Sequence, residues 1–172
     1  MTKQDILENH RKSVYLGIGS NLGNRVNNII KACCLVSQFC VIYKISNFYE
    51  SKSWPNDKFP KYLNIVIKCN TDLDPKALLL NLKYVEKKLG RRKKQKNYPR
   101  KCDIDIIDFK GLIYNNKDIN IPHPRLQNRN FVLIPLFEID KEWKYPKNKV
   151  SIYKLIKKLG LKSLRGINIF VN

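Results

Sequence analysis

The chain is organised around one stretch, Pro99-Arg100-Lys101-Cys102-Asp103-Ile104-Asp105-Ile106-Ile107. From Cys102 onward apolar and acidic residues alternate, which is the period of a half-buried β-strand. Asp103 and Asp105 therefore face the same side of that strand, roughly 6.5–7 Å apart. Two carboxylates so placed repel each other unless a cation lies between them, and hard oxygen ligands that leave room for water and phosphate suit Mg²⁺. The alternative interpretation is an acidic pair on a solvent-facing strand.

A cationic run next to this strand favours the metal interpretation. It extends from Gly90 to Arg100 and contains three lysines and three arginines. Nucleotide chemistry requires cations for the phosphate oxygens and carboxylates for the metal. Because the like charges of the run repel one another, we expect a loop that is disordered without ligand. Bound MgATP would supply the compensating negative charge, and the loop would then close over it and exclude water.

The length and composition are typical of a globular protein. With 172 residues, of which 43% are hydrophobic, we expect residues 13–172 to form a single domain with a sizeable core. Residues 1–12 are predicted to be a polar N-terminal extension, and the acidic residues Asp5 and Glu8 within it fit neither a secretory nor a transit signal. No apolar run approaches the roughly 18 residues needed to span a membrane.

The cysteines indicate a reducing compartment. The chain has five cysteines, and none of them shows the paired C-x-x-C spacing of a zinc site. They lie within apolar segments, so reduced core thiols are favoured over disulfides. Together with the absence of a signal or a membrane span, this pattern predicts a cytoplasmic protein with no membrane partner.

The formal net charge of +20 has two interpretations. A strongly basic surface can bind a polyanion such as nucleic acid. Alternatively, the lysines reflect the codon bias of an AT-rich genome, because asparagine and isoleucine are also abundant and all three are scattered along the whole chain. We favour codon bias and assign a chemical role only to the cluster between Arg91 and Arg100.

Hydrophobic periodicity and turn residues predict the order of the elements. Strands are expected at residues 14–20, 41–49, 62–69 and 102–107, and helices at 24–38, from Asp72 or Asp74 to Leu89, at 131–139 and, as the last helix, at 151–159. Residues 50–61 are expected to form a loop, 111–121 a short hairpin, 122–125 a rigid turn and 167–171 an apolar tail. The core order β-α-β-β-α-β predicts an α+β fold, a ferredoxin-like sandwich with helices on one sheet face and additional C-terminal helices. That fold carries enzymes, metal carriers and RNA-binding domains alike, so function must be argued from the site.

Several short motifs between Val14 and Ile139 resemble those of one family, the 6-hydroxymethyl-7,8-dihydropterin pyrophosphokinases (HPPK) of folate biosynthesis. The motifs are Gly17-Ile18-Gly19-Ser20-Asn21-Leu22-Gly23, Tyr62-Leu63-Asn64, Leu89-Gly90-Arg91 following Glu86, Pro99-Arg100-x-x-Asp103-Ile104-Asp105-Ile106, Pro122-His123-Pro124-Arg125-Leu126 and Arg129-x-Phe131-Val132-Leu133-x-Pro135-Leu136. Any one of them is a weak signal, but together they occur in the family's order and at its spacing.

The resemblance implies an enzyme that transfers pyrophosphate from ATP to the hydroxymethyl group of the pterin and releases AMP. Asp103 and Asp105 would hold two Mg²⁺ ions, which stabilise the entering and the leaving oxygen. The residues implied for catalysis are Arg91, Arg100, Asp103 and Asp105. Those implied for the pterin are Gly19, Ser51, Lys52, Trp54, Tyr62, Asn64 and Phe131, with Tyr62 and Phe131 on the two faces of the ring. Those implied for ATP are Glu86, Arg91, Lys93, Lys96, Arg100, Ile106, His123 and Arg129.

Each assignment has an ordinary structural alternative when the residues are taken alone. Tyr62 and Phe131 are also compatible with core aromatic residues, His123 with a turn residue and Arg129 with a solvated charge. At the level of function the alternatives are a basic RNA-binding domain and a relative that binds ligand but turns over poorly. The RNA-binding alternative is disfavoured, because Asp103 and Asp105 stand where such domains carry aromatic residues. We therefore expect ATP and the pterin as partners, no nucleic acid, and a monomer.

Overall fold

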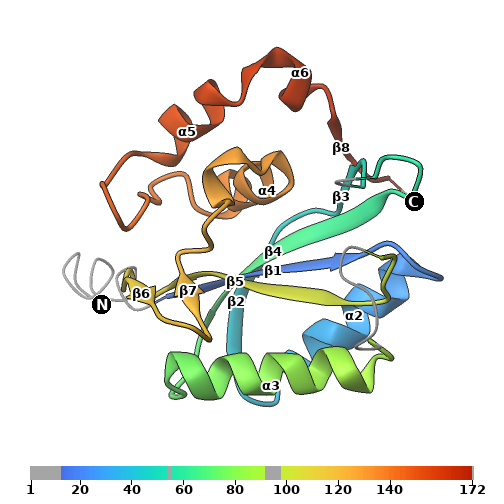
Figure 1. Ribbon diagram of the computed structural model, residues 1–172, viewed down its shortest axis with the longest axis vertical. Helices are drawn as coiled ribbons and strands as arrows, with labels where there is room; N and C mark the ends of the chain where they lie inside the picture. The colour runs from blue at the N-terminus through green and yellow to red at the C-terminus, as the bar shows by residue number, and fades with distance from the viewer. Residues whose placement is uncertain (1–12, 54–55, 92–97, 172) are drawn as a thin grey trace.

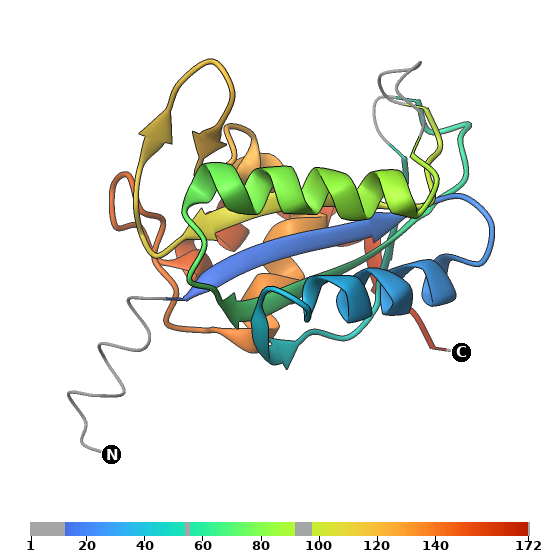
Figure 2. The same ribbon diagram turned by 90° about the horizontal axis from the view of Figure 1, so that it is seen from below.

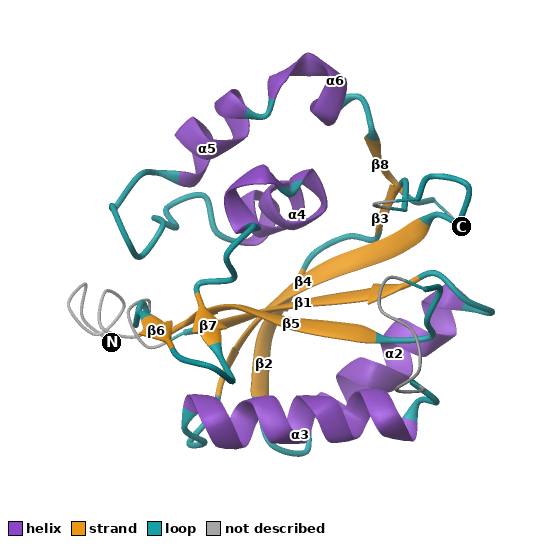
Figure 3. Cartoon of the chain, in the orientation of Figure 1, coloured by secondary structure: helices purple, strands orange, loops and turns teal. Residues whose placement is uncertain are grey.

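A six-stranded antiparallel sheet forms the centre of the computed structural model, which describes residues 13–53, 56–91 and 98–171 (Figures 1 and 3). Its strands are β1 (Val14–Ser20), β2 (Val41–Ile45), β3 (Tyr49–Ser51), β4 (Tyr62–Asn70), β5 (Asp103–Phe109) and β8 (Ile167–Ile169). They follow the order β5-β1-β4-β3-β8, and β2 also pairs with β4. A separate small hairpin joins β6 (Tyr114–Asn115) to β7 (Asn120–Ile121). The predicted combination of one sheet with several helices is thus confirmed, and the sheet is antiparallel.

Helices cover both faces of this sheet. Helices α2 (Arg25–Val36) and α3 (Pro75–Lys88) lie next to each other on one face, whereas α4 (Asn130–Ile139) and α5 (Ile152–Lys158) lie on the other (Figures 1 and 2). Along β1, Leu16 and Ile18 pack under α2 and α3, and Tyr15 packs in the second core with α4 and α5. The two helices of the predicted β-α-β-β-α-β core thus lie on one face, as predicted, whereas the additional C-terminal helices cover the second face, which was not predicted. Strand β4 reflects this double coverage, because its seven central residues are all buried, and a strand covered on both faces is apolar at nearly every position.

Polar caps fix the starts of the two long helices. The side chain of Asn24 accepts a hydrogen bond from the Asn27 N–H at 3.0 Å, and that of Asp74 accepts from the N–H groups of Lys76 and Ala77. Such side-chain acceptors satisfy N–H groups that have no partner within the helix. Helix α3 ends where predicted, before Gly90, which has a φ of 92°. Helix α2 ends two residues earlier than predicted.

The largest differences from the predicted elements lie at the C-terminal end. Helix α5 is not the last, because α6 (Gly160–Leu164) follows it directly. The predicted apolar tail contains β8, which pairs with β3 from Ser51 opposite Ile167 to Tyr49 opposite Ile169. The predicted strand at residues 41–49 is in fact two, β2 and the start of β3. Residues 1–12, the predicted extension, lie outside the described residues.

The cysteines and the helix lengths bear on two further predictions. Cys40, Cys69 and Cys102 are buried free thiols, as predicted, whereas Cys34 is exposed, so the core prediction is wrong for that residue. Among the helices that the structure describes, none has the length and apolar character needed to cross a bilayer.

Candidate active site

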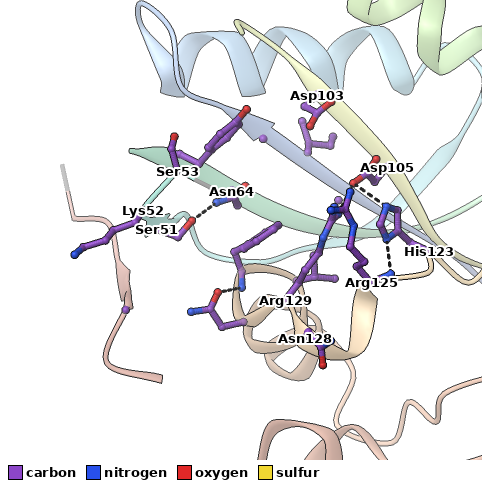
Figure 4. A pocket seen from close by; sticks show the side chains of 18 of the residues that line it. Ser51, Lys52, Ser53, Asn64, Asp103, Asp105, His123, Arg125, Asn128 and Arg129 are labelled. Carbon is purple, nitrogen blue, oxygen red and sulfur yellow. Dashed lines mark hydrogen bonds and ion pairs between the residues drawn. The ribbon is translucent and has the colours of Figure 1, made fainter. Parts of the chain in front are cut away.

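A cavity of about 1050 Å³ opens on the sheet face that carries α4 (Figure 4). Its volume is at the upper end of the range of roughly 300–1,000 Å³ that is typical of small-molecule sites. Strands β1, β4 and β5 contribute its floor, and its walls come from β3 and the loop after it, the turn before α4, the first turn of α4, helix α6 and Gly166. The predicted site residues that line it are Gly19, Ser51, Lys52, Tyr62, Asn64, Arg91, Arg100, Asp103, Asp105, His123, Arg129 and Phe131.

Two glycines of β1 keep the floor of the cavity open. Gly19 pairs with Asp103 on one side and with Asn64 on the other, and Gly17 pairs with Asp105. A Cβ atom on Gly19 would lie only 2.8 Å from Oδ1 of Asn64. The absence of a side chain therefore leaves room between the acidic pair and the amide, so that a ligand can lie directly on the backbone.

Asp103 is held by two arginines from the cationic run. Its Oδ1 accepts hydrogen bonds from Nη1 of Arg91 at 2.8 Å and from Nη1 of Arg100 at 3.1 Å. The backbone of Arg100 is fixed by Asn21, whose Oδ1 accepts from the Arg100 N–H at 2.7 Å and whose own N–H donates to the Arg100 carbonyl at 3.0 Å. Asn21 thus connects the loop after β1 to the start of the acidic strand.

Glu86 acts from beneath the site rather than in it. The side chain is buried, accepts a hydrogen bond from the Ile104 N–H at 2.8 Å and forms an ion pair with Arg91. Burial raises the pKa of Glu86 to about 7, against the opposing effects of the Ile104 hydrogen bond and the Arg91 charge. Glu86 does not line the cavity, so its contact with the site is through Arg91.

Ile106 also lies away from the cavity. Its side chain packs in the core under α2 and α3, as the alternation of the strand predicts. Any contact of this residue with ATP would therefore have to come from its backbone. Three further predicted residues, Trp54, Lys93 and Lys96, lie outside the described residues, as does the middle of the predicted closing loop.

Asp105 lies beside a different arginine and a histidine. Nη1 of Arg129 lies 2.8 Å from its Oδ2, and Nε2 of His123 lies 4.0 Å from the same oxygen. Figure 4 shows both side chains directed at Asp105. Burial lowers the pKa of His123, although the charge of Asp105 opposes this shift, so the ring is neutral at pH 7. Its Nδ1 accepts from the Arg125 N–H at 3.2 Å, which leaves the proton on Nε2.

Amide and aromatic side chains line the other part of the cavity. Nδ2 of the buried Asn64 donates to Oγ of Ser51 at 3.1 Å, and this fixes the orientation of the amide. Tyr62 from β4 and Phe131 from α4 are both only partly buried and both line the cavity. The guanidinium of Arg129 lies 5.5 Å above the Phe131 ring. The structure thus brings an aromatic, amide-bearing region and a charged region into one cavity.

The carboxylate pair fits magnesium only with help from a ligand. Across the described ranges, no cluster of three or more His, Cys, Asp or Glu side chains is arranged to hold a metal ion. Mg²⁺ is typically bound in proteins by one or two carboxylates, with water and phosphate oxygens completing its octahedron. Asp103 and Asp105 form such a donor set, and the cavity beside them has room for phosphates.

Several lining residues were not predicted from the sequence. They are Gly17, Ile18, Ser53, Asp57, Ile65, Arg125, Asn128, Asn130, Val132, Lys162, Ser163 and Gly166. Arg125 belongs to a motif already noted, as does Asn21, which holds Arg100. A role for Lys162, Ser163 and Gly166 was not predicted, because no motif includes them. They lie between the predicted helix at residues 151–159 and the predicted tail at 167–171.

The chain is similar to proteins of one family. The model of 7,8-dihydro-6-hydroxymethylpterin-pyrophosphokinase (HPPK) matches residues 15–141. The 2-amino-4-hydroxy-6-hydroxymethyldihydropteridine pyrophosphokinase of Aquifex aeolicus is 43% identical over 134 residues, 78% of this chain and 84% of that protein. The Haemophilus influenzae protein of the same name is 34% identical over 150 residues, 86% of this chain and 93% of that protein. The wild-type Plasmodium falciparum HPPK-DHPS crystal structure has a TM-score of 0.68 at 16% identity, covering 92% of this chain and 47% of that chain, which shows similarity of fold.

Proposed function

Because the chain belongs to the 7,8-dihydro-6-hydroxymethylpterin-pyrophosphokinase family, we propose that it transfers pyrophosphate from ATP to 6-hydroxymethyl-7,8-dihydropterin in folate biosynthesis. The hydroxyl oxygen of the pterin bonds to the β-phosphorus of ATP, and the bond from that phosphorus to the oxygen bridging the α- and β-phosphorus breaks. AMP leaves with the bridging oxygen, and the hydroxyl proton is released. The observation that carries the proposal is a cavity with the acidic pair and its cations in one part and Tyr62, Asn64 and Phe131 in the other.

Asp103 and Asp105 are the residues that would hold Mg²⁺, and we propose two ions. Bound there, the ions would neutralise phosphate charge and stabilise the entering and leaving oxygens. The carboxylates are suited to this because their side chains remain 30% and 39% exposed, toward the cavity. The rigid strand β5 sets the spacing of the two groups before any ligand arrives.

The cations around the acidic pair would bind the phosphates of ATP. Arg91, Arg100 and Arg129 each carry a planar guanidinium, which matches phosphate oxygens in a bidentate way. His123 is neutral, so it would donate a hydrogen bond from Nε2 rather than add a charge. Glu86 would orient Arg91 from below without touching the nucleotide.

Tyr62, Asn64 and Phe131 would bind the flat pterin. Stacking between two aromatic rings orients a planar heterocycle, and a fixed amide recognises its polar edge. Asn64 cannot rotate freely, because Ser51 holds its Nδ2. Gly19 lets the ring lie against β1, and the loop with Ser51, Lys52 and Trp54 would contact its edge.

We also propose that β1, β2, β4 and β5 with α2 and α3 are a ferredoxin-like core. The order β5-β1-β4-β2, antiparallel throughout, supports this assignment. Strands β3 and β8 and the helices α4 to α6 would then be additions that build the cavity on the second face.

The direct test is AMP release from ATP in the presence of 6-hydroxymethyl-7,8-dihydropterin and Mg²⁺. We expect AMP to form only when all three are present, and the pterin diphosphate to appear in equal amount. Asp103→Asn should abolish the reaction while the circular-dichroism spectrum stays unchanged, because the variant loses one metal ligand and keeps the shape of the side chain. AMP release that is independent of the pterin would contradict the proposal.

A further inference from the structure

The segment of residues 160–169 forms a wall of the cavity, although it lies beyond residues 15–141, which match the family. We propose that this segment is part of the pterin subsite and that Lys162 is a further substrate-binding residue, whose ammonium donates a hydrogen bond to an acceptor atom on the edge of the heterocycle. The inference rests on the proposed function for the identity of the ligand. It rests on the geometry of the segment for the place of Lys162.

One end of the segment is tied to the strand that carries Ser51. In the pairing of β8 with β3, Ile167 lies opposite Ser51, and the side chain of Ile167 is buried. The Phe170 N–H continues the contact by donating to the Phe48 carbonyl at 2.8 Å. Three paired residues and a buried side chain make this end a fixed part of the sheet.

The other end is tied to the helix that carries Phe131. Nδ2 of Asn130 donates to the Ser163 carbonyl at 2.6 Å, and the Gly166 N–H donates to the same carbonyl at 3.2 Å. Oδ1 of Asn130 accepts from the Phe131 N–H at 2.7 Å. The amide of Asn130 therefore joins the first turn of α4 to residue 163, and Lys162 is held beside the aromatic part of the cavity.

Lys162 differs from the arginines of the cavity in having its charge available. Arg91, Arg100 and Arg129 are each paired with Asp103 or Asp105. For Lys162, the described part of the chain contains no ion-pair partner, and the residue is exposed and lines the cavity. An ammonium group offers three donors and no acceptor. A pterin has a carbonyl oxygen and ring nitrogens along its edge, which are the acceptors that such a group can meet.

The test compares Lys162→Ala with the control variant Lys158→Ala. Lys158 is an exposed lysine on α5 that does not line the cavity. Calorimetry would measure the pterin titrated into protein saturated with a non-hydrolysable MgATP analogue and, separately, the binding of the analogue alone. We expect Lys162→Ala to raise the Kd of the pterin roughly 3- to 10-fold, the value of one hydrogen bond from a partly exposed charged group. The Kd of the nucleotide should stay unchanged, and Lys158→Ala should change neither.

A second variant tests the connection through Asn130, a positioning residue. Asn130→Ala removes the donor to the Ser163 carbonyl and adds no charge to the cavity. We expect faster amide hydrogen exchange at residues 160–166, a higher Kd for the pterin and an unchanged Kd for the nucleotide. A loss of folding would instead lower the affinity for both ligands.

The outcomes separate this inference from the proposed function. If wild-type protein binds the pterin and releases AMP while both variants bind the pterin as tightly as wild type, the inference is overturned alone. Weaker nucleotide binding by Lys162→Ala, with pterin binding intact, would also overturn it, because Lys162 would then serve the phosphates. Wild-type protein that neither binds the pterin nor releases AMP overturns the proposed function together with the inference.

Discussion

Arg129 and Asp105 form an ion pair in which Nη1 and Oδ2 are 2.8 Å apart, although both residues are proposed to bind other charges. The same relationship holds between Arg91 and Asp103. A metal ion that binds the carboxylates would have to displace the arginines from them. A phosphate that binds the arginines would likewise have to displace the carboxylates. Binding of the metal and of the nucleotide would therefore be coupled, because each ligand would release the group that the other needs.

This coupling predicts an unusual effect of Asp105→Asn. With the carboxylate removed, Arg129 is free and the repulsion of phosphate is reduced, so metal-free ATP should bind about tenfold more tightly than to wild type. Tenfold corresponds to about 1.4 kcal/mol, just below the range of about 1.5–3 kcal/mol for a hydrogen bond to a charged group. In the presence of Mg²⁺ the variant should release no AMP.

The measurement is calorimetry of ATP in EDTA, with Asp57→Asn as the control. Asp57 lines the same cavity but, within the described part of the chain, forms no ion pair with Arg129, Arg91 or Arg100. Asp57→Asn removes one negative charge from the cavity, as Asp105→Asn does, but it does not release Arg129 from its ion pair. Equal gains in the two variants would mean that net charge, rather than the ion pair, controls binding.

A second prediction concerns the stacking role of Phe131. Phe131→Ala should weaken pterin binding tenfold or more and leave nucleotide binding nearly unchanged. Aromatic stacking contributes about 0.5–1.5 kcal/mol beyond the burial of apolar area, and the lost contact area adds to it. Phe137→Ala is the matched control, because Phe137 lies on the same helix and packs in the same core but does not line the cavity. If both variants lose pterin affinity equally, Phe131 acts through packing of α4.

A third prediction uses the raised pKa of Glu86, about 7 in the folded protein. The unfolded chain loses this proton near pH 4.5, so between pH 4.5 and 7 the folded state binds more protons than the unfolded state. Stability contributed by the protonated group is full below pH 4.5 and is lost as the pH rises toward 7. Glu86→Gln does not titrate and should lack this loss.

Urea unfolding at pH 5 and at pH 7 measures the effect. From pH 5 to pH 7, wild type should lose about 1–3 kcal/mol of unfolding free energy relative to Glu86→Gln. Glu142→Gln, at an exposed position, should follow the wild-type dependence. A parallel pH dependence of Glu86→Gln and wild type would show that Glu86 is already ionised at pH 5 and that its ion pair with Arg91 outweighs burial.

The elements predicted correctly from the sequence are those whose signals are local. The strand at residues 14–20 and the Asp74-Pro75 start of α3 are recognisable without knowledge of distant partners. Strand β8 could not be predicted in this way, because three residues form a strand only when β3 offers its edge. The coverage of both sheet faces could not be predicted either, because the apolar run of β4 indicates burial without indicating which helices cover each face.

The residues of the candidate site also fall into those predictable from local sequence patterns and those that depend on distant contacts. Asp103 and Asp105 were predictable because two acidic residues interrupt a strand with period 2, and the motifs added Arg129 and Phe131. The role of Glu86 beneath Arg91 depends on burial under β5, which no spacing reveals. Lys162 was missed for a related reason, because its place in the cavity is set by the contact between Asn130 and Ser163, 33 residues apart.

The last prediction concerns the floor of the cavity at Gly19. In Gly19→Ala the new methyl carbon would lie 2.8 Å from Oδ1 of Asn64, so the amide must move and its hydrogen bond to Ser51 must lengthen or break. We expect a loss of about 1–3 kcal/mol in unfolding free energy, typical of overpacking, and a loss of pterin binding greater than that of nucleotide binding.

Gly17→Ala is the comparison on the same strand. There the methyl would meet the end of the flexible Ile107 side chain at 3.3 Å, which can yield by a small rotation. Thermal unfolding and pterin calorimetry on the two variants should therefore show a larger loss for Gly19→Ala on both measures. If Gly17→Ala reduces pterin affinity as much as Gly19→Ala does, the constraint is the open surface of β1 as a whole, and the fixed amide of Asn64 is not what orients the ring.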